Sequence, residues 1–194
     1  MGGLQLVGEA LFKFLDTIEK HVREVRKELD LRQVEELIKA IDEAKSVFVL
    51  GAGRSGFVAK AFAMRLMHLG YNVYVVGETV TPRIRKEDLL IAISGSGETT
   101  SVVSISRKAK ELIGSKLAVI TQNKDSTLAK MGDVVVVLKG KSKTEKNEEI
   151  AKIAPLGTMF ELTALIFLDG LTAEIMNRKN LTEKDLEARH AVLE

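Results

Sequence analysis

Two short segments combine glycine and serine in a pattern suited to holding a phosphate group. The first is Gly51-Ala52-Gly53-Arg54-Ser55-Gly56 and the second is Ser94-Gly95-Ser96-Gly97-Glu98-Thr99. Each follows a short apolar run and precedes a helical pattern, so each is expected to be a loop between a strand and a helix. Free backbone N–H groups at a helix N-terminus bind phosphate without a lysine, and glycines permit close approach. The hydroxyl groups would add hydrogen bonds to the phosphate oxygens.

The first segment also fits G-x-G-x-x-G, the pattern of dinucleotide-binding folds. Glu78, which comes after the next apolar run, could then hold a ribose. Ser55 inside the loop, a second serine-rich loop at a matching position, and room for only five strands all disfavour this interpretation. A further alternative is that both loops are merely tight turns. We favour one phosphate site built from both loops.

Five short, continuous apolar runs predict the strands that position these loops. They lie at residues 46–50, 72–76, 89–94, 116–121 and 133–138. Runs rich in β-branched residues without alternation are typical of strands buried on both faces of a parallel sheet. Helical patterns at 56–69, 84–86, 99–113 and 128–131 separate them. We therefore expect a three-layer α-β-α sandwich with a five-stranded parallel sheet in the flavodoxin-like order 2-1-3-4-5, in which the first and third strands are neighbours and the two loops converge.

Further helices are predicted on both sides of this core. Apolar residues at three- and four-residue spacing predict an amphipathic helix over 4–28 and a second helix over 31–44. Pro155 is expected to begin a long helix over 155–177, and a short helix is expected at 182–188. The charged, aperiodic segment 139–152 is expected to be a surface loop. We expect a single domain over residues 1–194, with a helical arm (1–45), a sheet core (46–138) and C-terminal helices and tail (155–194).

The composition excludes several classes of function. The chain has 194 residues, of which 45% are hydrophobic and 29% charged, and its net charge is only +2. This balance argues against nucleic-acid binding through a basic face. No apolar run approaches the roughly 20 residues of a membrane helix, so we expect no membrane contact and a cytoplasmic location. With no cysteine and three scattered histidines, we expect no metal site and no cofactor.

On these loops the chain resembles the SIS (sugar isomerase) domain family. The segment from Ser94 to Thr99 matches the phosphate motif S-x-S-G-x-T of that family, and the turn from Gly53 to Gly56 matches its first phosphate loop. The resemblance implies that a sugar phosphate is the ligand. The phosphate contacts that it implies are Ser55, Ser94, Ser96, Gly97 and Thr99, with Gly53 and Arg54 as possible further substrate contacts.

Within the family, four more segments are similar to the 6-phospho-3-hexuloisomerases. They are residues 64–68, 77–82, 155–161 and 189–191. This resemblance implies an isomerase that interconverts 3-hexulose 6-phosphate and fructose 6-phosphate, a place in the carbohydrate metabolism of the ribulose monophosphate pathway, and a homotetramer with active sites near subunit contacts. The alternatives are an isomerase of arabinose 5-phosphate or sedoheptulose 7-phosphate, and a sugar-phosphate sensor without catalytic activity.

Moving a carbonyl group between C2 and C3 requires proton transfer through an enediol, which one carboxylate can perform on one face of the substrate. Glu161 is the candidate base, because it lies in an apolar helix without lysine or arginine up to residue 176. The enediolate also needs a hydrogen-bond donor, for which His190 and His68 are the candidates. His190 lies on the C-terminal tail, so it could have to come from another subunit. The resemblance likewise implies Glu161 as the base and His190 as an assisting acid.

Two other residues receive roles outside catalysis. Glu98 occupies the first turn of a predicted helix, and there it is expected to organise its loop. His21 is expected to lie at the surface or at a subunit contact of the N-terminal helix.

Overall fold

The computed structural model describes residues 8–138 and 152–193 and contains a five-stranded parallel sheet in the order β2-β1-β3-β4-β5. This order confirms the prediction. The strands are β1 (Val47–Gly51), β2 (Val73–Val75), β3 (Leu89–Ile93), β4 (Lys116–Thr121) and β5 (Val134–Val137). β1 and β3 are direct neighbours, and Gly51 pairs with Ile93 at their carboxyl ends. The two glycine-serine loops therefore begin at the same level of the sheet.

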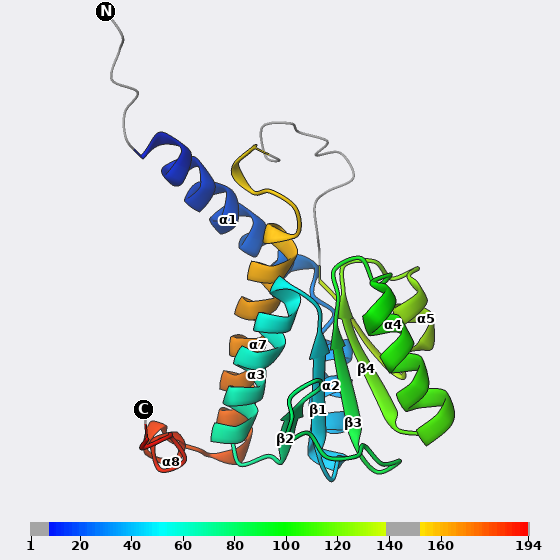
Figure 1. The fold of residues 1–194 in the computed structure, drawn as a ribbon. Coiled ribbons are helices and arrows are strands. Elements are labelled where there is room, and N and C mark those ends of the chain that lie inside the picture. The colour runs from blue at the N-terminus through cyan, green and yellow to red at the C-terminus, as the bar shows by residue number, and fades with distance from the viewer. Residues whose placement is uncertain (1–7, 139–151, 194) are drawn as a thin grey trace, which may run out of the picture.

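Helices cover both faces of the sheet, which confirms the three-layer architecture (Figure 1). One face carries α2 (Leu31–Glu43), α3 (Arg54–His68) and α7 (Thr158–Lys179), and the other carries α4 (Thr100–Arg107), a π-helical turn (Lys108–Ile113) and α5 (Thr127–Met131). In β1, Val47 and Val49 pack on the first side, while Phe48 and Leu50 pack on the second. Burial on both faces explains why the strands show no alternation of polar and apolar residues.

The N-terminal helix α1 (Glu9–Glu28) projects beyond the sheet in Figure 1. Its buried residues are His21 and Val25, so the expectation that His21 lies at the surface is wrong. Leu11, Phe12 and Leu15 are 57%, 65% and 50% exposed. The apolar stripe that predicted this helix is therefore covered only near its C-terminal end. The predicted start at residue 4 lies outside the described residues.

Three predicted elements differ from the structure. No helix forms at 84–86, because Arg85 and Asp88 close a turn: the Arg85 N–H donates to Asp88 Oδ2 at 2.7 Å, and the Asp88 N–H donates to the Arg85 carbonyl at 3.1 Å. The helix predicted over 99–113 is α-helical only to Arg107. The last long helix begins at Thr158 and not at Pro155, since Leu156 has a left-handed φ of 53° that no helix accommodates.

The remaining elements agree with their predictions within a few residues. The short C-terminal helix α8 spans Glu183–Glu187. The loop predicted over 139–152 lies outside the described residues except for its last residue, Lys152, which is helical and not part of a loop. In the part of the chain that the structure describes, no helix combines the length and the apolar character that crossing a membrane requires.

Candidate active site

The first loop connects the end of β1 to the start of α3 by a very close approach of backbone to backbone. A Cβ atom added at Gly51 would lie 2.5 Å from the carbonyl oxygen of Ser55, so only glycine fits at this position. Gly53 occupies the N-cap position of α3 with a positive φ of 56°. Ser55 follows in the first turn of the helix and is buried. The first turn of α3 is thus presented directly at the carboxyl edge of the sheet.

The second loop brings its hydroxyl groups together through its own backbone. The buried Ser94 Oγ accepts a hydrogen bond from the Gly97 N–H at 3.2 Å and lies 3.2 Å from Thr99 Oγ1. The exposed Ser96 Oγ accepts from the Glu98 N–H, also at 3.2 Å. All the phosphate-contact residues predicted in this loop therefore lie in one compact turn, in which the Gly97 N–H already donates to Ser94 Oγ.

The helices that follow these loops have uncapped N-termini. Among the described side chains, none accepts a capping hydrogen bond from the first turn of α3 or of α4. The helices α2 and α5 are capped by Asp30 and Ser126, whereas α1 and α7 also lack a side-chain cap. Uncapped N–H groups and the positive end of the helix dipole favour a bound anion. A phosphate group is therefore electrostatically suited to the edge where α3 and α4 begin.

The start of α7 contacts both loops at once. Its Phe160 ring packs on the second loop, where a Cβ atom at Gly95 would lie 2.9 Å from Phe160 Cδ1. The next residue, Glu161, forms an ion pair with Arg54 of the first loop. Two consecutive residues of α7 thus join the loops into a single site, and they place the predicted base beside the predicted phosphate contacts.

The Glu161 carboxylate is mostly shielded from water. Its side chain is 13% exposed, whereas that of Arg54 is 59% exposed. Both residues line a pocket of about 230 Å³, whose other walls are apolar side chains of α3 and α7. An arginine that is anchored on one side and open to solvent on the other can leave the carboxylate for a ligand. The sequence analysis missed this pair, although a half-buried carboxylate in an apolar helix requires a cation somewhere in the fold.

The two candidate histidines lie at the other end of α3. His68 occupies the last turn of that helix and is buried, and its ring stacks on His190 with 5.3 Å between ring centroids. Arg189 donates a hydrogen bond to the His68 carbonyl at 3.2 Å. From Arg54 to His68 the helix rises roughly 20 Å. One chain therefore brings the histidines to each other and not to Glu161.

Two acidic residues near the loops have partners that explain their positions. Glu98 accepts a hydrogen bond from the Thr127 N–H at 2.7 Å, as expected of a residue that organises its loop. This backbone hydrogen bond is the main cause that holds the pKa of Glu98 below its usual value. Glu78 pairs with Lys60 at 2.6 Å, and the pair joins the segment after β2 to α3. Glu78 is thus occupied by a lysine of its own chain.

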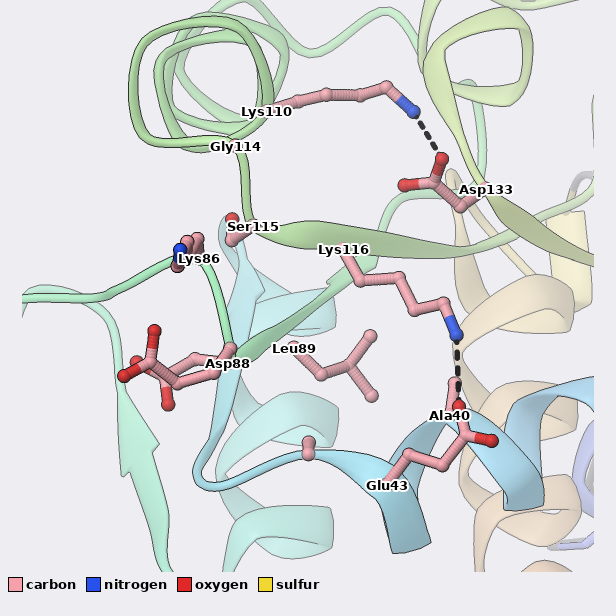
Figure 2. Close-up of a pocket in the computed structure, with 12 residues that line it drawn as sticks. Ala40, Glu43, Lys86, Asp88, Leu89, Lys110, Gly114, Ser115, Lys116 and Asp133 are labelled. Atoms are coloured by element: carbon pink, nitrogen blue, oxygen red, sulfur yellow. Dashed lines mark hydrogen bonds and ion pairs between the residues drawn. The ribbon is translucent and has the colours of Figure 1, made fainter.

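A larger pocket of about 450 Å³ lies at the opposite edge of the sheet, where β3 and β4 begin (Figure 2). Two of its lysines are matched by acids: Lys110 pairs with Asp133 at 2.6 Å and Lys116 with Glu43 at 3.3 Å. The helices α2 and α4 run toward this edge with their C-terminal ends, whose dipoles disfavour anions. Although this pocket is larger, its electrostatics therefore do not favour phosphate binding. No cluster of potential metal ligands occurs among the residues that the structure describes.

Comparisons with known proteins identify the family of the chain. The model of the SIS domain matches residues 40–168. An uncharacterized protein of Archaeoglobus fulgidus is 67% identical over 184 residues, which cover 95% of this chain and 100% of the relative. A protein of Methanocaldococcus jannaschii named 3-hexulose-6-phosphate isomerase is 44% identical over 161 residues, 83% of this chain and 84% of the relative.

A solved structure has a similar fold. It is that of a hypothetical protein from Methanococcus jannaschii, for which a molecular function of 3-hexulose-6-phosphate isomerase was inferred. It superposes with a TM-score of 0.82 at 40% identity and covers 94% of this chain and 99% of its own. With the family model matching well over half of the chain, the chain belongs to the SIS domain family.

Proposed function

We propose that this protein is a sugar-phosphate isomerase that interconverts 3-hexulose 6-phosphate and fructose 6-phosphate. The observation that carries the proposal is the contact of Phe160 and Glu161 with the two loops, one residue to each. A phosphate bound by the loops leaves the carbon chain of its sugar beside the Glu161 carboxylate. Relatives named for this reaction at 40–44% identity support the choice of substrate.

In the proposed mechanism, the first turns of α3 and α4 hold the phosphate together with Ser55, Ser94, Ser96 and Thr99. Gly53 leaves open space beside the backbone, where the phosphate can approach the N–H groups. The substrate draws Arg54 from Glu161 toward its own oxygens, which frees the carboxylate to act as a base. The charge of Arg54 then lies beside the substrate oxygens, where it stabilises the enediolate.

One carboxylate can carry out both proton transfers at carbon. Glu161 removes the proton from C2 of the 3-ketose, while the oxygen on C3 takes up a proton from a donor, and the 2,3-enediol results. Glu161 then returns its proton to C3, and the hydroxyl on C2 loses its proton as the new carbonyl group forms. No cofactor is needed for these steps, because no electrons leave the substrate.

We propose that the donor is His190 or His68 and that it is supplied by a second copy of the chain. In one chain both histidines lie at the far end of α3, so an intramolecular role would require a large rearrangement. The exposed apolar residues of α1 support an assembly of copies, and we expect a homotetramer. Sedimentation equilibrium tests this: replacing Phe12, which is 65% exposed, by glutamate should shift the mass toward smaller species. A monomeric unaltered protein would contradict both the assembly and the donor in trans.

The test of the reaction is proton exchange in deuterated water. On incubation with fructose 6-phosphate, an isomerase of this kind introduces deuterium at C3, and NMR of the sugar carbons detects it. Chemical-shift changes without exchange would identify a sugar-phosphate sensor. Exchange with arabinose 5-phosphate or sedoheptulose 7-phosphate, and not with fructose 6-phosphate, would assign the enzyme to another substrate of the same chemistry.

A further inference from the structure

The second loop is fastened to the segment that joins β4 to α5. Thr121 Oγ1 donates to the Gly95 carbonyl at 3.1 Å, and the Leu128 N–H donates to the Gly97 carbonyl at 3.1 Å. These bonds fix the peptide groups of the loop before any ligand arrives. They would form with almost any side chains in the loop, because the acceptors are backbone carbonyls.

Glu98 differs, because it fastens the loop through its side chain. Its carboxylate accepts the hydrogen bond from the Thr127 N–H at 2.7 Å, while its own N–H donates to Ser96 Oγ at 3.2 Å. The following residue, Thr99, lies 3.2 Å from Ser94 Oγ and is the N-cap of α4. Glu98 thus stands between two hydroxyl groups of the phosphate loop, and its carboxylate is bound to a neighbouring helix.

A carboxylate in this position carries an electrostatic cost. Two negative charges a few ångströms apart repel each other, so a glutamate beside a phosphate weakens binding unless it contributes something else. Coulomb repulsion therefore predicts that removing Glu98 strengthens phosphate binding. If Glu98 instead holds the loop in place, removing it weakens phosphate binding.

Building on the proposed function, we propose that Glu98 is a positioning residue that sets the affinity of the loop for the phosphate of the substrate. By accepting the Thr127 N–H, its carboxylate keeps Ser96 and Thr99 at the separation that a phosphate requires. The gain from a preorganised loop exceeds the repulsion between carboxylate and phosphate. Because Glu98 does not touch the reacting carbons, it affects substrate binding and leaves the chemical step unchanged.

Three variants separate these effects. Glu98→Ala removes both the charge and the acceptor, whereas Glu98→Gln removes the charge and keeps an acceptor oxygen. Asp125→Ala is the control, since it removes a carboxylate two residues before Thr127 that accepts no hydrogen bond from any described residue. Isothermal titration with inorganic phosphate and with fructose 6-phosphate measures binding, steady-state kinetics separates KM from kcat, and thermal unfolding verifies folding.

We expect Glu98→Ala to raise the Kd for both ligands and the KM about 10-fold, as the loss of one hydrogen bond to a charged group implies, with kcat within about twofold. Glu98→Gln and Asp125→Ala should bind as well as the unaltered protein or more tightly. Unchanged or tighter binding by Glu98→Ala would overturn the proposal, and so would a Glu98→Gln variant as weak as the alanine variant. If the unaltered protein binds neither ligand, the proposed function fails and the inference falls with it.

The donor side of the same bond gives an independent test. Thr127 is the first residue of α5, a position where proline is favoured, and Ser126 before it has an extended ψ of 162° that suits a residue preceding proline. Thr127→Pro therefore removes the N–H donor without breaking the helix, and it also removes the Thr127 hydroxyl, which hydrogen-bonds Glu98 as well. Thr127→Ala removes the hydroxyl alone and keeps the N–H, so it is the control. The proline variant should bind as weakly as Glu98→Ala, and the double variant should be no weaker than either single one. Additive losses would contradict a shared bond.

Discussion

Replacing Glu161 by glutamine should abolish most of the turnover and leave the fold intact. Glutamine has the same size and still accepts a hydrogen bond from Arg54, but it cannot take a proton from carbon. General-base catalysis contributes about 10²- to 10⁴-fold, so kcat should fall by that factor, which corresponds to roughly 3–5 kcal/mol of barrier. The lost ion pair involves an arginine that is 59% exposed, and such pairs contribute about 1 kcal/mol or less. The melting temperature should therefore fall by no more than about 4 °C.

A second ion pair between the same two helices provides the control. Arg65 of α3 pairs with Asp169 of α7 at 3.4 Å, two turns further along α7 than Glu161. Asp169→Asn makes the same change of charge to amide and should leave kcat unchanged. Coupled assay of both variants on 3-hexulose 6-phosphate gives kcat and KM. Near-normal turnover by Glu161→Gln, or an equal loss in both variants, would refute the assignment of Glu161 as the base.

Three further predictions concern the loops and the stability. Ser94→Ala together with Ser96→Ala should raise KM at least 10-fold with a smaller effect on kcat, and an unchanged KM would contradict the phosphate site. Gly97→Ala should lower the free energy of unfolding by about 2–3 kcal/mol in denaturant titrations, because φ is 67° and the added Cβ would collide with Ser126. The third prediction concerns Asp42. Burial alone would raise the pKa of its carboxyl group, but hydrogen bonds from Tyr71 and Lys179 hold this pKa below its usual 3.8. A lowered carboxyl pKa contributes stability above about pH 4 that is lost on further acidification, so Asp42→Asn should be less sensitive to acid than the unaltered protein in this range.

The arrangement of the sheet could be predicted from the sequence because burial on both faces leaves an unmistakable pattern. Residues 47–50 and 89–93 are continuous apolar runs, and each ends at a loop whose composition admits a tight turn into a helix. Two such loops lie side by side only where the order of the strands in the sheet reverses, and only a few topologies have such a point. The local pattern and the topology therefore agree, and the position of the phosphate loops follows from both.

The predictions failed where a single backbone angle or a distant partner decides the outcome. Proline at residue 155 is compatible with the first turn of a helix, but the left-handed φ of Leu156 delays the start of α7 to residue 158. The turn at 85–88 depends on one side-chain hydrogen bond from the Arg85 N–H to Asp88. The ion pair between Arg54 and Glu161 joins residues 107 positions apart, which no local spacing can indicate.

The structure also changes the explanation of the glycines in the two loops. The sequence suggests that these glycines permit the close approach of a ligand, but most of them make room for other parts of the protein. A Cβ atom would collide with the Ser55 carbonyl at Gly51, with the Phe160 ring at Gly95 and with the Ser126 side chain at Gly97. Gly53 is different, since a Cβ atom there would meet nothing within 4 Å. Space for a ligand beside the backbone is therefore available at Gly53, at the uncapped start of α3. The other glycines act within the fold, because they let α3, α7 and the start of α5 pack closely against the two loops. In the proposed complex, this packing lets one phosphate reach both loops while its sugar lies against Glu161.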